Sequence, residues 1–141
     1  MTETPFHYVD LRAFCYATED EARVERALRT LLPEGFAVDR TTSEGFHSDR
    51  IVVLSARVEN ADDVRHVLDR LAALDLDRVR EELDDRVNDN CALFMRLDKQ
   101  AAYGGRIERG AGLELRGKIE AYPANRATAV ENAAAALEAR S

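Results

Sequence analysis

Apolar and polar residues alternate with a period of two in several short stretches, a pattern typical of strands that bury one face. The stretches at 8–15 and 91–98 follow this pattern, and the one at 113–121 has the cleanest alternation. Two more strands, at 36–42 and 50–58, flank a turn-rich link at 43–49, which predicts a hairpin. Because Ile51-Val-Val-Leu54 is nearly all apolar, we expect this strand to be central and buried on much of both faces.

Apolar residues at helical spacing predict three helices between these strands. Thr18 and Glu21 form a predicted capping box for the first helix, and Asn60 caps the second. A third helix is expected to continue past Leu74-Asp75, with Leu76, Val79, Leu83 and Val87 as its apolar stripe. The Ala-rich stretch 124–139 predicts a lightly docked terminal helix, anchored by Val130 and Leu137.

This succession predicts an α+β fold of the order β-α-β-β-α-α-β-β-α, a two-layer sandwich. We expect a mostly antiparallel sheet with helices on one face. A length of 141 residues predicts one domain over 1–141, with its core at about 8–121 and the terminal helix at 124–139.

The apolar stretches are short and carry no targeting signal. None approaches the roughly 18–20 apolar residues that span a bilayer, and the first ten residues show no signal-peptide pattern. We therefore expect a cytoplasmic protein without membrane contact.

The charge pattern is acidic and poor in lysine. The net charge is −7, and the 20 basic residues are 18 arginines and only two lysines, Lys99 and Lys118. Such a surface resembles that of salt-adapted, halophilic proteins. In molar salt the Debye length falls to about 3 Å, so the acidity would barely repel a polyanion such as RNA.

The sequence lacks the usual catalytic and metal-binding patterns. Cys15 and Cys91 have no CxxC or Cys/His spacing, and the three histidines, at positions 7, 47 and 66, have no carboxylate at metal-ligand spacing. No nucleophile elbow, P-loop or dinucleotide fingerprint occurs. We expect a protein that is not an enzyme, without a cofactor or metal.

One segment, 96–109, combines cationic, aromatic and glycine residues. The stretch 91–122 around it has six bases against four acids, so that it carries +2 and the rest of the chain −9. Lysine and arginine contact phosphates, glutamine bonds base edges, and tyrosine stacks on unpaired bases. This predicts RNA contacts by Arg96, Lys99, Gln100, Tyr103 and Arg106. The alternative interpretation is structural, with Tyr103 packed on the core and Asp98 neutralising Lys99.

A second cluster is expected on the outward side of the first strand. If that strand and the last one are neighbours, Tyr8, Arg12 and Phe14 line up with Arg116 and Lys118. Several RNA-binding modules present such an aromatic and basic sheet face. The alternative is an ordinary sheet surface partly covered by a helix.

Four stretches of the sequence resemble an archaeal family described as RNA-binding proteins or predicted exosome subunits. They are Tyr16-Ala-Thr-Glu-Asp-Glu-Ala-Arg-Val24, Leu31-Leu-Pro-Glu34, Glu44-Gly-Phe-His47 and, most specifically, Leu97-Asp-Lys-Gln-Ala-Ala-Tyr-Gly-Gly-Arg106. The family's turn often reads Gly-His-His-Gly-Asn-Pro, from which this chain departs at Phe46 and Ser48. Of that turn, only His47 is carried over as an RNA-binding candidate.

The resemblance implies a small α+β fold similar to that of a ribosomal protein that binds 5S rRNA, and a role near the exosome. The resulting hypothesis is a non-catalytic RNA-binding protein, whose partners are RNA and exosome subunits. The alternative is a protein-interaction adapter, or a homodimer joined through a sheet edge, without direct RNA contact.

Overall fold

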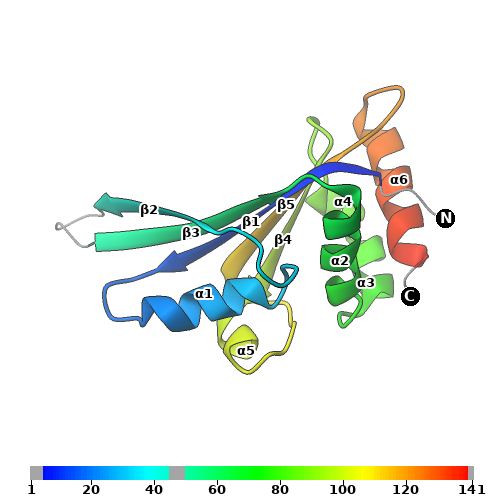
Figure 1. Cartoon of the computed structure of the whole chain (residues 1–141). Helices are drawn as coiled ribbons and strands as arrows, with labels where there is room; N and C mark the ends of the chain where they lie inside the picture. Colours follow the sequence, from blue (N-terminus) through cyan, green and yellow to red (C-terminus); the bar gives the residue numbers. More distant parts are fainter. Residues whose placement is uncertain (1–4, 45–49, 140–141) are drawn as a thin grey trace.

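A five-stranded antiparallel sheet forms one layer of the molecule, and its helices form the other (Figure 1). The computed structural model describes residues 5–44 and 50–139. The strands are β1 (Phe6–Cys15), β2 (Asp39–Glu44), β3 (Arg50–Val58), β4 (Ala92–Asp98) and β5 (Gly112–Ile119). The helices are α1 (Glu21–Arg29), α2 (Ala61–Leu71), α3 (Leu76–Glu81), α4 (Leu83–Arg86), α5 (Lys99–Tyr103) and α6 (Arg126–Glu138). The predicted α+β sandwich is confirmed.

The strands are arranged in the order β2-β3-β1-β5-β4, so that β1 is the central strand. Its alternate residues Val9, Leu11, Ala13 and Cys15 are all buried, as the alternation predicts. The same alternation buries Leu113, Leu115 and Ile119 of β5. One face of the sheet therefore packs on the helices and forms the core, and the other face points away from the helices.

The helices supply the other half of this core. Val24, Ala27 and Leu28 of α1 are fully buried. Asn60 caps α2 as predicted, because its side chain accepts a hydrogen bond from the backbone N–H of Asp62. The buried stripe of α2 is the predicted one, made by Val64, Val67, Leu68 and Leu71.

Two predictions about individual elements are wrong. The residue that caps α1 is Asp20, whose carboxylate accepts from the N–H of Ala22, because the chain is still in a turn at Thr18. β3 lies inside the sheet between β2 and β1, as expected of a central strand, but it is not buried on both faces, because only Val52 and Leu54 of its apolar run are buried. Ile51 and Val53 lie on the opposite, partly exposed side, so that run is buried on one face.

Three element boundaries also differ from the sequence expectation. β2 begins at Asp39, not at 36, and the predicted third helix is divided at Glu82 into α3 and α4. Its apolar stripe of Leu76, Val79, Leu83 and Val87 is nevertheless buried throughout. The expected loop after β4 contains the short helix α5, which Asp98 caps by accepting from the N–H groups of Gln100 and Ala101.

The terminal helix α6 packs on its own domain, against α3, α4 and β5 (Figure 1). Leu137 is buried as predicted, while Val130 is only partly buried. Ala129 and Ala133 are fully buried, since side chains without bulk let the helix approach closely. At its start, the Nε of Arg126 donates to the carbonyl of Val87 at 2.9 Å.

Candidate nucleic-acid interface

The face of the sheet that points away from the helices carries charged and aromatic side chains, which lie side by side on neighbouring strands. β1 pairs with β5, as the second predicted cluster requires, and places Tyr8 opposite Lys118 and Asp10 opposite Arg116. β4 pairs with β5 on the other side, with Phe94 opposite Arg116 and Arg96 opposite Glu114. We call this surface the open face. Its charged and aromatic members on β1, β3, β4 and β5 are Tyr8, Asp10, Arg12, Phe14, Arg57, Phe94, Arg96, Glu114, Arg116 and Lys118.

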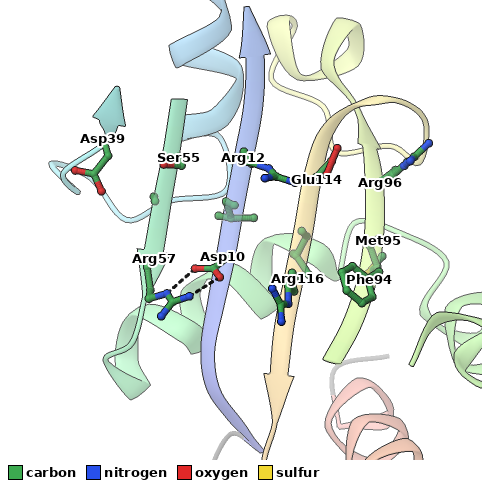
Figure 2. Close-up of a pocket in the computed structure, with 13 residues that line it drawn as sticks. Asp10, Arg12, Asp39, Ser55, Arg57, Phe94, Met95, Arg96, Glu114 and Arg116 are labelled. Atoms are coloured by element: carbon green, nitrogen blue, oxygen red, sulfur yellow. Dashed lines mark hydrogen bonds and ion pairs between the residues drawn. The ribbon is translucent and has the colours of Figure 1, made fainter. Parts of the chain in front are cut away.

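A groove of about 620 Å³ runs across this surface (Figure 2). It extends from Asp39 on β2 to Phe94 and Arg96 on β4, with Arg12 and Glu114 between them. Its polar wall comes from all five strands, which extend in the sequence from β1 to β5. Only the assembled sheet brings them together.

Two ion pairs, one between β1 and β3 and one between β1 and β5, neutralise the half of the groove around β1. Arg57 donates two hydrogen bonds to Asp10, Nε to Oδ1 at 2.8 Å and Nη2 to Oδ2 at 2.9 Å (Figure 2). This bidentate contact raises the pKa of Arg57 further above its usual range. The Nη2 of Arg12 contacts Oε2 of Glu114 at 2.9 Å. Both acids of the inner strands are therefore already occupied.

The other half of the groove keeps its positive charge. Among the residues that the structure describes, Arg96 and Arg116 have no acidic partner, and Lys118 donates only to the carbonyl of Asn90. Three cations are thus available on β4 and β5. All three belong to the RNA contacts predicted from the sequence.

Exposed aromatic rings lie beside these cations. Phe94 is 44% exposed, an unusual position for a phenylalanine, and the guanidinium of Arg116 lies 5.7 Å from its ring centroid. The rings of Tyr8 and Phe14 are approached by Arg57 at 4.0 Å and by Arg12 at 5.4 Å. Phe94 is the most accessible flat surface of the three and can accept a stacked base.

Lys99 is not part of this surface. It is 6% exposed, and its ammonium donates to Oε1 of Glu19 at 2.7 Å and to the carbonyl of Phe14 at 2.8 Å. The hydroxyl of Tyr103 donates to Oε2 of the same carboxylate at 3.0 Å. The structural alternative describes this part of the segment better, although the partner of Lys99 is Glu19 and not Asp98. We therefore leave Lys99 and Tyr103 out of the proposed contact surface.

This buried network perturbs two ionisable groups. Burial by itself would raise the pKa of Glu19, but the hydrogen bonds from Lys99, from the N–H of Tyr16 and from Tyr103 outweigh it and lower that pKa. Burial and the bond to Glu19 raise the pKa of Tyr103 to about 12. The network joins α5 to the turn between β1 and α1, which gives the Asp-Lys-Gln-Ala-Ala-Tyr run a role in holding the fold.

The remaining predicted contacts are divided. Gln100 and Arg106 are exposed, at α5 and in the loop after it, and Arg106 pairs loosely with Glu108 at 3.7 Å. His47 lies outside the described residues. The expected single patch is thus two groups: Arg12, Arg96, Arg116 and Lys118 on the open face, and the α5 residues near α1.

Sequence reasoning missed Phe94 and Arg57. Alternation along 91–98 and 50–58 does place both on outward positions. The pattern does not show which strands are neighbours in the sheet. Strand order decides whether outward residues of different strands contact one another.

Within residues 5–44 and 50–139, no group of three or more histidine, cysteine or carboxylate side chains has the arrangement of a metal site. In the same part of the chain, no helix is long and apolar enough to cross a membrane.

Comparison with known proteins places the chain among its relatives. A family model described as RNA binding matches residues 8–119. The chain belongs to this RNA-binding family. A protein of Pyrococcus abyssi named RNA-binding protein is 28% identical over 137 residues, which cover 89% of both chains. The archaeal family resemblance found in the sequence is thereby confirmed.

Solved structures of similar proteins agree with the fold of this RNA-binding family member. A DUF54 protein from Methanothermobacter thermautotrophicus is 38% identical and superposes with a TM-score of 0.82 over 94% of this chain and 98% of that one. A DUF54 protein from Archaeoglobus fulgidus is 23% identical, with a TM-score of 0.84 over 93% and 99%. The second likeness supports the fold alone.

Proposed function

We propose that this protein binds RNA on the open face of its sheet, and that the β4–β5 half of the groove makes the main contacts. The observation that carries the proposal is the exposed ring of Phe94, which lies across the strands from Arg116 and two residues from Arg96 on β4. In the described part of the chain neither arginine has an acidic partner. Membership of a family described by RNA binding supports the same ligand.

The chemistry of the groove favours unpaired bases over a duplex. A ring in a sheet stacks on a base that is free of its helix, while arginine and lysine contact the phosphates beside it. Stacking depends little on ionic strength, whereas the phosphate contacts weaken as salt rises. A protein that works in concentrated salt would depend mainly on Phe94.

The test is the affinity for a short single-stranded RNA, measured by fluorescence anisotropy across a salt series. Replacing a stacking aromatic residue costs about 1–3 kcal/mol per base, so we expect Phe94→Ala to weaken binding by roughly 5- to 150-fold at every salt concentration. Arg116→Gln should weaken binding at low salt and approach the parent at high salt.

Matched controls are available on other surfaces. Tyr122 is 85% exposed and lies beyond the end of β5, and Arg26 is exposed on α1. Tyr122→Ala and Arg26→Gln should bind as the parent does. Equal affinity for all four variants would refute the assignment of the open face.

We further propose that the protein acts by binding, without catalysis, and that it does so beside an RNA-processing complex such as the exosome. This rests on the family resemblance. Affinity purification with and without nuclease tests it. Exosome subunits that remain bound after nuclease treatment support the association, and loss of every partner would leave RNA binding alone. A nuclease-resistant partner of an RNA-binding-defective Phe94→Ala protein would favour the adapter function.

A further inference from the structure

A second, smaller hollow lies at the outer edge of β4, next to the groove. Two isolated bridges flank it: Val87 pairs with Leu93 near one end of the strand, and Arg109 pairs with Leu97 near the other. Between them the strand edge remains open over a hollow of about 290 Å³. We call it the edge pocket; its lining residues are Arg86, Phe94, Met95, Arg96, Arg109 and Gly110.

The loop between α5 and β5 is shaped to bring Arg109 into this place. The backbone N–H of Asp98 donates to the carbonyl of Glu108 at 2.8 Å, and that of Gly110 donates to the carbonyl of Arg96 at 3.3 Å. A Cβ at position 110 would lie 2.6 Å from the Cβ of Asp98, closer than packed atoms allow. Glycine at 110 therefore lets the loop lie against the strand.

Three arginines from three chain segments line this pocket, and two of them, Arg86 and Arg109, contact the carboxylate of Glu82. Oε2 of Glu82 is 2.5 Å from Nη2 of Arg109 and 3.1 Å from Nε of Arg86. The bond to Arg109, followed by that to Arg86, lowers the pKa of Glu82 against the effect of its burial. Glu82 is thus charged at neutral pH, yet it cannot neutralise both arginines, and Arg96 adds a third positive charge.

Unused donors remain in the pocket. Each guanidinium has five N–H groups, and Glu82 takes up only one atom of each of its two close partners. In an antiparallel strand the N–H and C=O of one residue point to the same side, so the N–H of Arg96 faces this edge together with its carbonyl. Such an array of donors matches the non-bridging oxygens of a phosphate group.

The edge pocket and the groove are continuous. Phe94, Met95 and Arg96 line both of them, so a ligand on the open face reaches the pocket by passing over β4. In Figure 2, Arg96 extends from β4 away from the centre of the sheet.

We propose that the edge pocket binds a phosphate group of the RNA strand whose bases lie on the open face. This inference rests on the proposed function. An RNA strand with a base stacked on Phe94 crosses the edge of β4 at the pocket. Arg86, Arg96 and Arg109 then bind its next phosphate. Glu82 holds Arg86 and Arg109 in place and competes with that phosphate for them.

Because Glu82 competes with the phosphate, removing its charge should raise the RNA affinity, whereas removing a purely structural residue should lower it or leave it unchanged. Glu82→Gln removes the competing charge, and we expect it to raise the affinity for single-stranded RNA about 3- to 10-fold. The matched control is Glu81→Gln, the same change at the adjacent, exposed position, which should change affinity less than 2-fold. A Glu82 that serves only to hold the fold would give lower affinity or none of this gain.

Removing an arginine should have the opposite effect. Arg109→Gln should weaken binding about 5- to 10-fold and reduce the slope of log affinity against log salt by about 0.7, the value for one phosphate contact of a single strand. Circular dichroism confirms that each variant is folded before its affinity is compared.

The source of the phosphate is decided by the ends of the RNA. Equal affinity for oligonucleotides with phosphorylated and hydroxyl ends assigns the pocket to a backbone phosphodiester. A preference for a phosphorylated end that disappears in Arg109→Gln assigns it to a terminal phosphomonoester. Where Arg109→Gln also weakens binding, either result supports the pocket as a phosphate site.

Failure of the pocket is distinguishable from failure of the proposed function. If Arg116→Gln weakens binding while Arg109→Gln changes neither affinity nor salt slope, and Glu82→Gln behaves as Glu81→Gln does, the open face stands and the edge pocket is refuted. If the parent protein binds no RNA, both proposals are overturned.

Discussion

The two lysines of this chain have opposite environments, and replacing each of them by methionine separates folding from RNA binding. Lys99 is buried against Glu19, with side chains 7% and 19% exposed and a contact of 2.7 Å. Lys118 lies on the open face and donates to the carbonyl of Asn90. The same substitution therefore tests a buried ion pair in one case and a proposed RNA contact in the other.

The loss of unfolding free energy in Lys99→Met depends on Glu19, which stays buried without its ion-pair partner. Removing one partner of a buried ion pair costs about 3–5 kcal/mol, because the other charge stays buried. Here Glu19 keeps the hydrogen bonds from Tyr103 and from the N–H of Tyr16, which favours the lower end, about 3 kcal/mol. At roughly 2–4 °C per kcal/mol for a chain near this size, Tm should fall by about 6–12 °C.

The assays are denaturant unfolding followed by circular dichroism, and RNA affinity measured on the folded protein. We expect Lys99→Met to lose stability and to keep its RNA affinity, and Lys118→Met to do the reverse. A free energy of unfolding for Lys99→Met within about 0.5 kcal/mol of the parent would refute the buried ion pair. Weaker RNA binding by fully folded Lys99→Met would return this lysine to the contact surface.

Three further predictions concern the same network. Tyr103→Phe should lower the free energy of unfolding by about 1–2 kcal/mol, because the hydrogen bond to Glu19 is lost. The pKa of Tyr103 is about 12 in the folded protein and thus above its unfolded value, so the parent should lose this stabilisation as pH rises from about 10 to 12. Ultraviolet titration of the phenolate measures this ionisation. The pKa of Glu19 is lowered in the folded protein, so ionised Glu19 stabilises the fold fully above the pKa of the unfolded state, and this stabilisation disappears as pH falls through the pKa of the folded state. Glu19→Gln should therefore make the stability depend less on pH in that range. An unchanged acid unfolding curve would contradict the assignment. Gly112→Ala should destabilise by about 1–3 kcal/mol in thermal unfolding, since Gly112 has φ +106° and an added Cβ would lie 2.6 Å from the Cβ of Lys99; a neutral result would mean that α5 moves aside easily.

The candidate site shows where sequence reasoning succeeds. Alternation along the first and last strands correctly places Arg12 and Arg116 on the outward side, and the β1–β5 pairing brings them to one surface. It fails at Lys99, where residue type indicated a surface cation. A lysine directly after a strand can point outward or fold back under the sheet, and the choice depends on Glu19, eighty residues earlier in the chain.

The sequence by itself determined the strands and most of the helices, because the periods of two and 3.6 residues are local properties of the backbone. It also determined which side of β1, β4 and β5 is polar. Only the tertiary structure decided that β1 is central, that Phe94 adjoins Arg116, and that Arg86, Arg96 and Arg109 line one pocket. These are contacts between distant segments, and they depend on strand order and loop packing, which no local pattern encodes.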